Sequence, residues 1–212
     1  QVTCQFPTGD TLFGPLNLSL ESSLCALVGR NASGKTRLLR LLAGLDEPAS
    51  GHIERTGTHV YVAQQQDILP HTTLAELLGF EAIFAARARI DSGDYQPDDL
   101  ETLDGLWDLA ERLGEAFTRA KLPPFDPYKP AGELSGGERI RALLCGAFTA
   151  EADYMLLDEP TNHLDRQGRA WFYDQLARYQ GGVLVASHDR ELLAKVPRIL
   201  ELSASGLRSY GG

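Results

Sequence analysis

The chain has 212 residues, which is enough for one large α/β domain that buries its own core without disulfide bonds. Hydrophobic residues make up 43% of the sequence and charged residues 23%, and this composition excludes disordered, collagen-like and coiled-coil proteins. The 29 acidic and 20 basic residues give a formal net charge of −9. This charge argues against a broad nucleic-acid-binding face, because such a face needs clustered lysine and arginine.

No apolar run is long enough to cross a membrane and the N-terminus lacks the pattern of a secretion signal, so we expect a soluble, cytoplasmic protein. The cysteines Cys4, Cys25 and Cys145 show no metal-ligand spacing and are expected to be buried, reduced thiols. The chain begins at Gln1 and its only methionine is Met155, so we expect it to be a piece of a longer protein.

Short apolar runs that end abruptly in polar residues are typical of strands buried on both faces of a parallel sheet. Such runs occupy residues 24–28, 60–63, 155–157 and 183–186. Apolar residues at helical spacing predict helices over about 38–45 and 140–148. Because strands alternate with helices, the pattern predicts βαβ units and an α/β fold.

The stretch from about residue 73 to residue 129 interrupts this alternation. It carries only helical periodicity, which includes Leu100, Leu103 and Trp107, and then a proline-rich run at 122–127. We interpret it as an inserted helical subdomain. Its acidic residues between Asp91 and Glu115 are interpreted as a solvated face, with a specific acidic binding surface as the alternative.

Residues 29–36 fit the pattern G-x-x-x-x-G-K-[ST] between a buried strand and a helix. Glycine allows the backbone to curl until successive N–H groups point at one centre, and the following helix adds the positive end of its dipole, so the motif binds phosphate. Lys35 would then reach the β- and γ-phosphates, and the Thr36 hydroxyl would ligate Mg²⁺. A strand-to-helix turn whose glycines only relieve strain is the alternative. The motif comprises Gly29, Arg30, Asn31, Ala32, Ser33, Gly34, Lys35 and Thr36.

Asp158 and Glu159 come directly after a predicted strand, where ligands bind in open α/β sheets. Because neighbouring strand residues face opposite ways, we expect Asp158 to approach Mg²⁺ through a water and Glu159 to polarise the attacking water. Such a pair can also cap a helix or face solvent. The phosphate-binding motif upstream favours the catalytic interpretation.

A second glycine-containing segment, residues 134–138, stands directly before the helix predicted over 140–148. Ser135 and Glu138 have the spacing of a capping box, which needs no ligand. Capping does not require Gly136 and Gly137, and an open helix N-terminus is also an anion site, so both interpretations can hold together.

Gln64 and His188 each end a predicted strand, and either one alone is usually structural. Gly29 and Glu159 are expected at the same edge of the same sheet. Together the four residues outline a single site.

These segments, in this order, resemble the ATP-binding cassette (ABC) ATPases over essentially the whole chain. Phe6 is a weaker match, to the aromatic residue that stacks on adenine in that family. The matching segments are 29–36 (Walker A), Gln64 (Q-loop), 134–138 (LSGGE signature), Asp158 and Glu159 (Walker B and the glutamate after it), Asp165 (D-loop) and His188 (switch histidine).

The resemblance implies one ABC ATPase domain over residues 1–212. Its fold would be a P-loop NTPase core with a mostly parallel sheet, an antiparallel β portion at the N-terminus and an inserted helical subdomain. The core would comprise 1–72 and 131–212, and the insertion about 73–130.

The resemblance also implies ATP and Mg²⁺ as ligands, with Thr36, Gln64 and Asp158 at the metal and with Gln64, Glu159 and His188 in hydrolysis. In that family the nucleotide is held between Walker A of one cassette and the signature of another. The partner-facing residues would be Ser135, Gly136, Gly137, Glu138 and Asp165. A second cassette, in cis or as a homodimer, is therefore an expected partner.

Residues 158–165 and 187–190 are similar to the ABC-F subfamily, whose members act on ribosomes and carry two cassettes without membrane domains. Residues 210–212 resemble the start of the linker between those cassettes, through which a ribosome would be reached. One alternative is the nucleotide-binding subunit of a membrane transporter, and another is a nonhydrolysing module that uses ATP as a structural ligand. Ala32 departs from the usual Walker A glycine, and we expect the loop to tolerate the roughly 1 kcal/mol cost of an alanine at positive φ.

Overall fold

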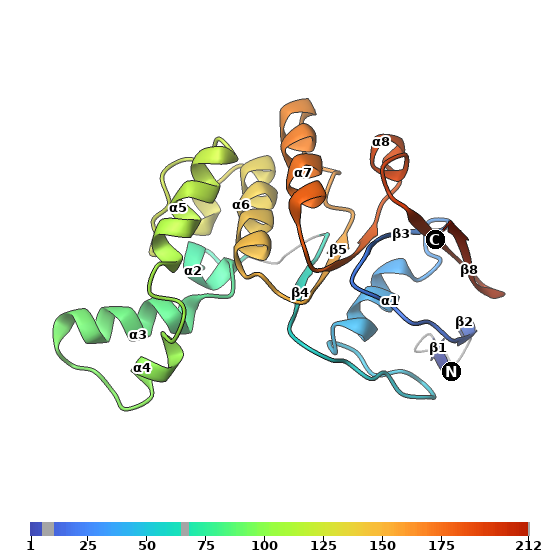
Figure 1. Cartoon of the computed structure of the whole chain (residues 1–212), viewed down its shortest axis with the longest axis horizontal. Helices are drawn as coiled ribbons and strands as arrows, with labels where there is room; N and C mark the ends of the chain where they lie inside the picture. The colour runs from blue at the N-terminus through green and yellow to red at the C-terminus, as the bar shows by residue number, and fades with distance from the viewer. Residues whose placement is uncertain (6–10, 65–67, 212) are drawn as a thin grey trace. The chain divides into compact units, whose positions relative to one another are not determined.

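A computed structural model describes residues 1–5, 11–64 and 68–211 (Figure 1). It divides the chain into two compact units, which we call the core unit (1–65, 151–162 and 172–212) and the helical unit (66–150 and 163–171). The helical unit contains the segment of about 73–130 that the sequence predicts to be an insertion, and it also contains 131–150 and 163–171.

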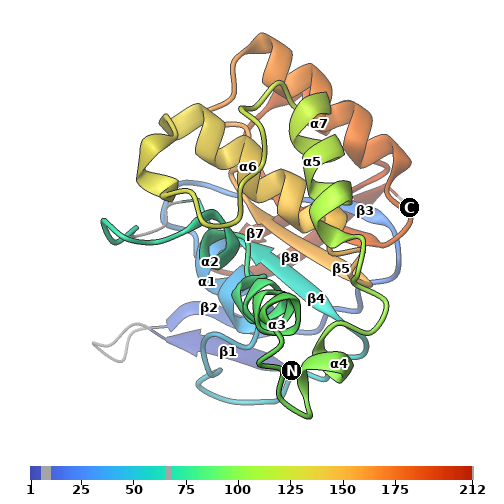
Figure 2. The same ribbon diagram turned by 90° about the vertical axis from the view of Figure 1, so that its left-hand side faces the viewer.

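The core unit is built on a six-stranded sheet with the order β4-β5-β6-β3-β7-β8, in which only β8 is antiparallel to its neighbour. Figure 2 shows β4 and β5 side by side. The four strands predicted from apolar runs are confirmed to within one residue at each end. The strands are β3 (Leu24–Val28), β4 (His59–Val62), β5 (Tyr154–Asp158), β6 (Gly182–Ala186), β7 (Arg198–Ser203) and β8 (Gly206–Gly211).

The parallel strands end at similar levels, and this sets the position of the residues that follow them. Val62 pairs with Leu157, and Ala186 pairs both with Asp158 and with Leu27. The segments that leave β3, β4, β5 and β6 therefore begin at one edge of the sheet, as expected for parallel strands.

The N-terminal strands β1 (Val2–Gln5) and β2 (Thr11–Leu16) form a separate two-stranded antiparallel sheet, which confirms the predicted antiparallel portion. Helix α1 (Lys35–Leu42) follows β3 and buries three leucines. It ends where Gly44 adopts φ 71°, a left-handed conformation that commonly stops a helix. Leu45, predicted to lie in this helix, is therefore outside it and is 54% exposed.

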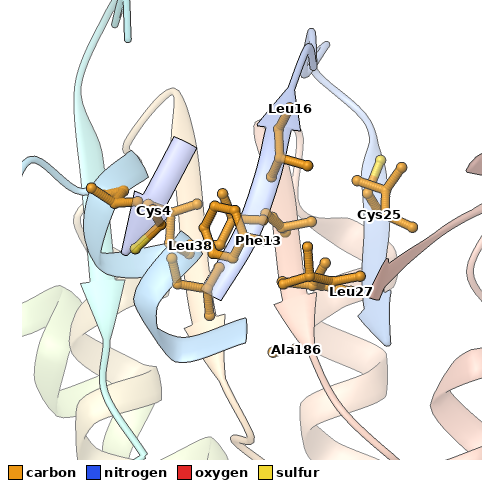
Figure 3. Packing of buried hydrophobic residues seen from close by; sticks show 13 residues of the cluster. Cys4, Phe13, Leu16, Cys25, Leu27, Leu38 and Ala186 are labelled. Carbon is orange, nitrogen blue, oxygen red and sulfur yellow. The ribbon is translucent and has the colours of Figure 1, made fainter. Parts of the chain in front are cut away.

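The small sheet, α1 and the large sheet share one hydrophobic cluster, drawn in Figure 3. Phe13 comes from β2, Leu38 from α1, Leu27 from β3 and Ala186 from β6, and all of them are buried. Burial of each leucine-sized side chain contributes about 1.5–3 kcal/mol, so the cluster fixes α1 against the inner strands of the sheet. The three cysteines are buried, as predicted, and the described residues contain no disulfide bond between them.

Helix α7 (Arg166–Arg178) leads back to the core unit, and α8 (Arg190–Leu193) follows β6. The Asp189 carboxylate caps α8 by accepting hydrogen bonds from the backbone N–H groups of Glu191 and Leu192. Among the described residues, no helix combines the length and apolar character that a membrane crossing requires.

In the helical unit, α5 packs against α6 and α3 against α4. The predicted helical periodicity fails between α4 and α5, because the chain turns there and Gly105 has φ 69°. Trp107, which lies in this turn, is exposed, as is Leu100 within α4, whereas Leu109 and Leu113 are buried. The helices are α2 (Leu74–Leu77), α3 (Glu81–Ser92), α4 (Asp99–Thr102), α5 (Leu109–Arg119) and α6 (Gly136–Thr149), with a 3₁₀ turn at Ala131–Glu133.

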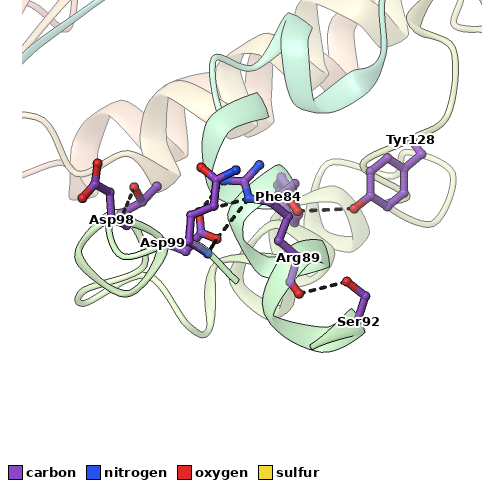
Figure 4. A network of polar contacts seen from close by, with 8 residues as sticks. Phe84, Arg89, Ser92, Asp98, Asp99 and Tyr128 are labelled. Carbon is purple, nitrogen blue, oxygen red and sulfur yellow. Dashed lines mark hydrogen bonds and ion pairs between the residues drawn. The ribbon is translucent and has the colours of Figure 1, made fainter. Parts of the chain in front are cut away.

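One acidic residue of the insertion is structural and not part of a solvated face. Asp99 is 2% exposed and accepts hydrogen bonds from the Arg89 guanidinium and, at 2.8 Å, from the backbone N–H of Gln96 (Figure 4). The Arg89 hydrogen bonds are the main cause that lowers the pKa of Asp99. This ion pair joins α3 to α4, while Asp91, Asp94 and the other acidic residues of that surface are exposed.

Candidate active site

The loop between β3 and α1 depends on two glycines. A Cβ atom on Gly29 would lie 2.6 Å from the Leu202 carbonyl oxygen, and one on Gly34, which has φ 95°, would lie 2.9 Å from the Leu12 side chain. Neither position can hold a larger residue without displacing its neighbours. Ala32 adopts φ 61°, so the loop accepts alanine in the left-handed conformation as expected.

Lys35 lies back over this loop and is 9% exposed. Its Nζ donates a hydrogen bond to the Gly29 carbonyl oxygen at 3.0 Å and lies 3.2 Å from Nε2 of His188. The first turn of α1 carries no acidic side chain, so nothing there neutralises the positive end of the helix. The ammonium group and the helix N-terminus together make this end of the site strongly electropositive.

Asp158 is a buried carboxylate at the end of β5, and it is 1% exposed. Within the described part of the chain, neither of its oxygens has a hydrogen-bond partner. Burial raises its pKa, and the polar groups of Thr36 and Tyr61 and the charge of Lys35 oppose the rise. A buried carboxylate without a partner is unfavourable, so the fold leaves a site that a bound cation or its water would complete.

The protein residues here fit Mg²⁺. Thr36, Gln64 and Asp158 all line one pocket and offer a hydroxyl, an amide oxygen and a carboxylate. Mg²⁺ prefers such oxygen ligands and usually keeps waters while binding one or two carboxylates together with substrate phosphates. Thr36 and Asp158 would hold the ion most directly, and Gln64, which is exposed just after β4, would approach from the strand next to β5.

Glu159 adopts φ 49°, and its backbone N–H donates to the Ala186 carbonyl oxygen at 2.8 Å. Its side chain is 10% exposed, and Oε1 lies 3.5 Å from Nε2 of His188, whose side chain is 52% exposed. Burial raises the pKa of Glu159, and the charges of His188 and Lys35 oppose the rise. A carboxylate with a raised pKa is better suited to accept a proton from water.

A pocket of about 630 Å³ connects these groups and falls in the size range of small-molecule sites. Of the residues predicted for the site, it brings together Asn31, Ala32, Gly34, Lys35, Thr36, Gln64, Asp158, Glu159 and His188. Gly29, Arg30 and Ser33 belong to the loop but do not line the pocket. Phe6, predicted to stack on adenine, lies outside the described residues.

The pocket is also lined by Leu12, Arg37, Arg40 and Asn162, none of which the sequence singled out for the site. Arg37 and Arg40 follow the phosphate-binding motif within α1. Their position just after the motif is the sequence feature that could have identified them as pocket residues. Two further residues, outside the pocket lining, connect the segments that carry Glu159 and His188. Thr161 and Ser187 are buried with their hydroxyl oxygens 3.4 Å apart, which joins the segment after β5 to the segment after β6.

The signature-like segment lies in the helical unit, and its capping box is confirmed. The backbone N–H of Glu138 donates to Oγ of Ser135 at 3.3 Å, and Oε2 of Glu138 accepts from the backbone N–H and the hydroxyl of Ser135 at 2.9 and 2.7 Å. The two hydrogen bonds that the Glu138 carboxylate accepts lower its pKa, and the one from the Ser135 hydroxyl has the larger effect.

The two glycines of this segment differ. A Cβ atom on Gly137 would lie 3.0 Å from the His163 carbonyl oxygen, whereas one on Gly136 would meet no atom within 4 Å in the described part of the chain. Packing therefore gives a reason for glycine at 137 but not at 136, where the N-terminus of α6 stays open. Asp165, in the same unit, accepts a hydrogen bond from the backbone N–H of Gly168 at 2.7 Å, at the start of α7.

The model of the family described as ABC transporter matches residues 14–162. The chain belongs to this family. It is an ABC ATPase cassette, and its P-loop NTPase fold, expected from the sequence, is confirmed by solved structures. One is the ATP-binding subunit of an ABC transporter, with a TM-score of 0.77 at 17% identity, covering 99% of this chain and 87% of that chain. Another is a dimeric bacterial ABC transporter cassette, with a TM-score of 0.72 at 20% identity, covering 99% and 96%.

The relatives confirm that this cassette is most like the ABC-F subfamily. It is 36% identical over 206 residues to the energy-dependent translational throttle protein EttA of Mycobacterium tuberculosis, covering 88% of this chain and 37% of that protein. It is 29% identical to ABC transporter F family member 5 of Arabidopsis thaliana, covering 95% of this chain and 27% of that protein. The chain thus spans well under half the length of these relatives.

Proposed function

We propose that the cassette binds Mg²⁺ and ATP in the pocket beside Lys35 and hydrolyses ATP when a second cassette closes over the nucleotide. The observation that carries this proposal is the buried, unpartnered carboxylate of Asp158 in the same pocket as Lys35, Glu159 and His188. A buried carboxylate without a protein partner is typical of a site that a ligand completes. Titratable groups with shifted pKa values also cluster at functional sites.

In this proposal the glycine-shaped loop and the start of α1 bind the phosphates through their N–H groups, and Lys35 exchanges the Gly29 carbonyl oxygen for phosphate oxygens. Bound Mg²⁺ would neutralise part of the charge on the phosphates. Glu159 orients the attacking water and accepts its proton. His188, with Nε2 at 3.5 Å from Oε1 of Glu159, holds this carboxylate in place.

The second cassette is part of the proposal because one chain provides two half-sites. The open N-terminus of α6 at Ser135, Gly136 and Gly137, with Glu138 and Asp165, would face the nucleotide of the partner. A solved relative of this fold is a dimeric, post-hydrolysis cassette bound to ADP and Pi, with a TM-score of 0.74 at 20% identity. We expect the isolated chain to be mainly monomeric without nucleotide, and to hydrolyse ATP slowly.

The wider role that we propose is action on ribosomes, in the cytoplasm, as one cassette of a tandem ABC-F protein with the helical subdomain inserted at about residues 73–130. The name of the mycobacterial relative, a translational throttle protein, supports translation as the process. The alternative is the ATP-binding subunit of a membrane transporter, which is what one solved relative of this fold is.

The hydrolytic function is tested by phosphate release from Mg²⁺-ATP by the chain and by a Lys35→Ala variant. We expect slow release by the unmodified chain, and weaker ATP binding with loss of release in the variant. Equal ATP affinity of the two proteins in a titration would remove Lys35 from the site, and ATP binding without any release would favour the nonhydrolysing module. Co-sedimentation of the longer protein with ribosomes, with and without ATP, tests the wider role.

A further inference from the structure

Two arginines beside the phosphate-binding loop share one carboxylate. Arg37 and Arg40 both lie on α1 and both line the pocket. Arg40 donates to Asp46 from Nε at 2.8 Å and from Nη2 at 3.1 Å, while Nη1 of Arg37 lies 3.0 Å from Oδ2 of the same carboxylate. The side chain of Asp46 is 11% exposed, and the two arginine side chains are about 40% exposed.

The two contacts with Asp46 are unequal. Arg40 binds both carboxylate oxygens through two nitrogens, which is the strong, bidentate geometry. Arg37 uses one nitrogen and shares Oδ2 with Nε of Arg40. The hydrogen bonds from Arg40 are also the main cause that lowers the pKa of Asp46, and the charge of Arg37 contributes less. Arg37 can therefore leave Asp46 while Arg40 keeps it paired and hydrogen-bonded.

Arg37 is placed to use this freedom. It follows Thr36 directly in the first turn of α1, whose N–H groups have no acidic side chain to bind. Two guanidinium groups against one carboxylate leave one positive charge at the pocket that Asp46 does not neutralise. An arginine that is still partly hydrated needs little desolvation to reach an anion nearby.

We propose that Arg37 exchanges Asp46 for a phosphate of the bound nucleotide and is thus a further binding residue of the site, while Arg40 retains Asp46. This inference rests on the proposed function. Lys35 reaches the β- and γ-phosphates in such loops, and the backbone N–H groups of the turn hold the α- and β-phosphates. Arg37, on that turn, pairs with the phosphates nearest the nucleoside, which ADP and ATP share.

The test is equilibrium binding of ADP and of ATP to the full chain by calorimetry, in EDTA, so that no hydrolysis contributes. Arg37→Gln is expected to raise the Kd of both nucleotides by the same factor, about tenfold for one charge-assisted contact. Arg37→Lys should restore part of the affinity. Asp46→Asn removes the competing carboxylate and is expected to lower the Kd of ADP.

Arg178→Gln is the matched charge control, because it removes one positive charge from an exposed pair with Asp174 in the same unit, away from the pocket. It should leave both Kd values unchanged, and Arg37→Gln should reduce the salt dependence of binding where Arg178→Gln does not. Thermal unfolding checks that Arg37→Gln folds as the unmodified chain does.

The inference is overturned if Arg37→Gln binds ADP and ATP as the unmodified chain does, or if only ATP binding weakens. Failure of the proposed function has a different signature: the unmodified chain would bind neither nucleotide, or Lys35→Ala would bind both unchanged. If Lys35→Ala weakens binding and Arg37→Gln does not, the site stands and Asp46 remains the partner of Arg37.

Discussion

Nε2 of His188 lies 3.5 Å from Oε1 of Glu159, and these side chains come from the ends of adjacent strands, β6 and β5. The histidine therefore contacts the carboxylate to which we assign the proton. Because His188 is half exposed and Glu159 is largely buried, the pair presents one solvated group and one desolvated group to the pocket.

Glu159→Gln should bind ATP with nearly unchanged affinity and release phosphate at least about 100-fold more slowly, since glutamine cannot accept a proton. Phosphate release and nucleotide titration measure the two quantities separately. Glu21→Gln, at an exposed position of the same unit, is the control and should behave as the unmodified chain. Hydrolysis by Glu159→Gln at the unmodified rate would show that another group acts as the base.

Asp158→Asn should stabilise the nucleotide-free chain at neutral pH by about 1–3 kcal/mol, because it removes a buried carboxylate that lacks a partner, and it should abolish hydrolysis. The folded pKa of Asp158 is raised, so the stability of the unmodified chain falls as pH rises from the ordinary value of 3.8 through the raised one. The stability gained by Asp158→Asn is therefore complete at pH values above this range and absent at pH values below it. Thermal unfolding of both proteins across this pH range is the measurement, and a gain that does not change with pH would contradict the assignment.

Gly136→Ala should leave the fold intact, because its Cβ meets no described atom within 4 Å. If the open N-terminus of α6 binds the nucleotide of a partner, the added methyl group should weaken the ATP-dependent dimer that accumulates in the Glu159→Gln background. Light scattering after size-exclusion chromatography measures the dimer.

Gly114→Ala is the matched control for this experiment, since Gly114 lies inside α5 and its Cβ would also meet no described atom within 4 Å. It should raise helix stability by up to about 1 kcal/mol and leave association unchanged. Equal dimer formation by Gly136→Ala and Gly114→Ala would refute a role for position 136 at the interface.

Ser187→Ala should lower kcat several-fold, with little change in nucleotide affinity, if the buried hydroxyl contact with Thr161 positions the segments that carry Glu159 and His188. The Ser187 hydroxyl also accepts a hydrogen bond from the Asp189 backbone N–H at 3.1 Å, and each of the two hydrogen bonds lost is worth about 1 kcal/mol. Tyr154→Phe removes another buried hydroxyl from β5, at the opposite end of the strand from Asp158, and should leave kcat unchanged. A parallel loss of kcat in both variants would indicate general destabilisation instead of positioning.

Three of the four strands predicted from apolar runs, β3, β5 and β6, are largely buried, whereas β4 is buried only at Val62. β6 is buried at all five of its positions, and a continuous apolar run records that burial directly. β7 alternates buried and partly exposed residues, and β8 is mostly exposed, so neither one produces such a run. The site residues at strand ends were predictable for the same reason, because each of them follows a recognisable strand.

The features that the sequence did not predict depend on contacts between residues that are distant in sequence, or on residue types that are common on protein surfaces. Asp99 is one of several acidic residues in its segment, and the sequence does not show that it is the one that Arg89 binds. Arg37 and Arg40 occupy helical positions that usually face solvent, and only the fold places Asp46 and the pocket beside them.

The left-handed backbone at Glu159 has a consequence for substitutions at this position. Glycine would suit φ 49° better than any residue with a Cβ atom, and the chain gives up roughly 1–2 kcal/mol by holding a long side chain there. Glu159→Gly should therefore yield a protein that resists heat better yet cannot turn over. Under the proposed function, the carboxylate at this position serves hydrolysis at that cost in folding stability.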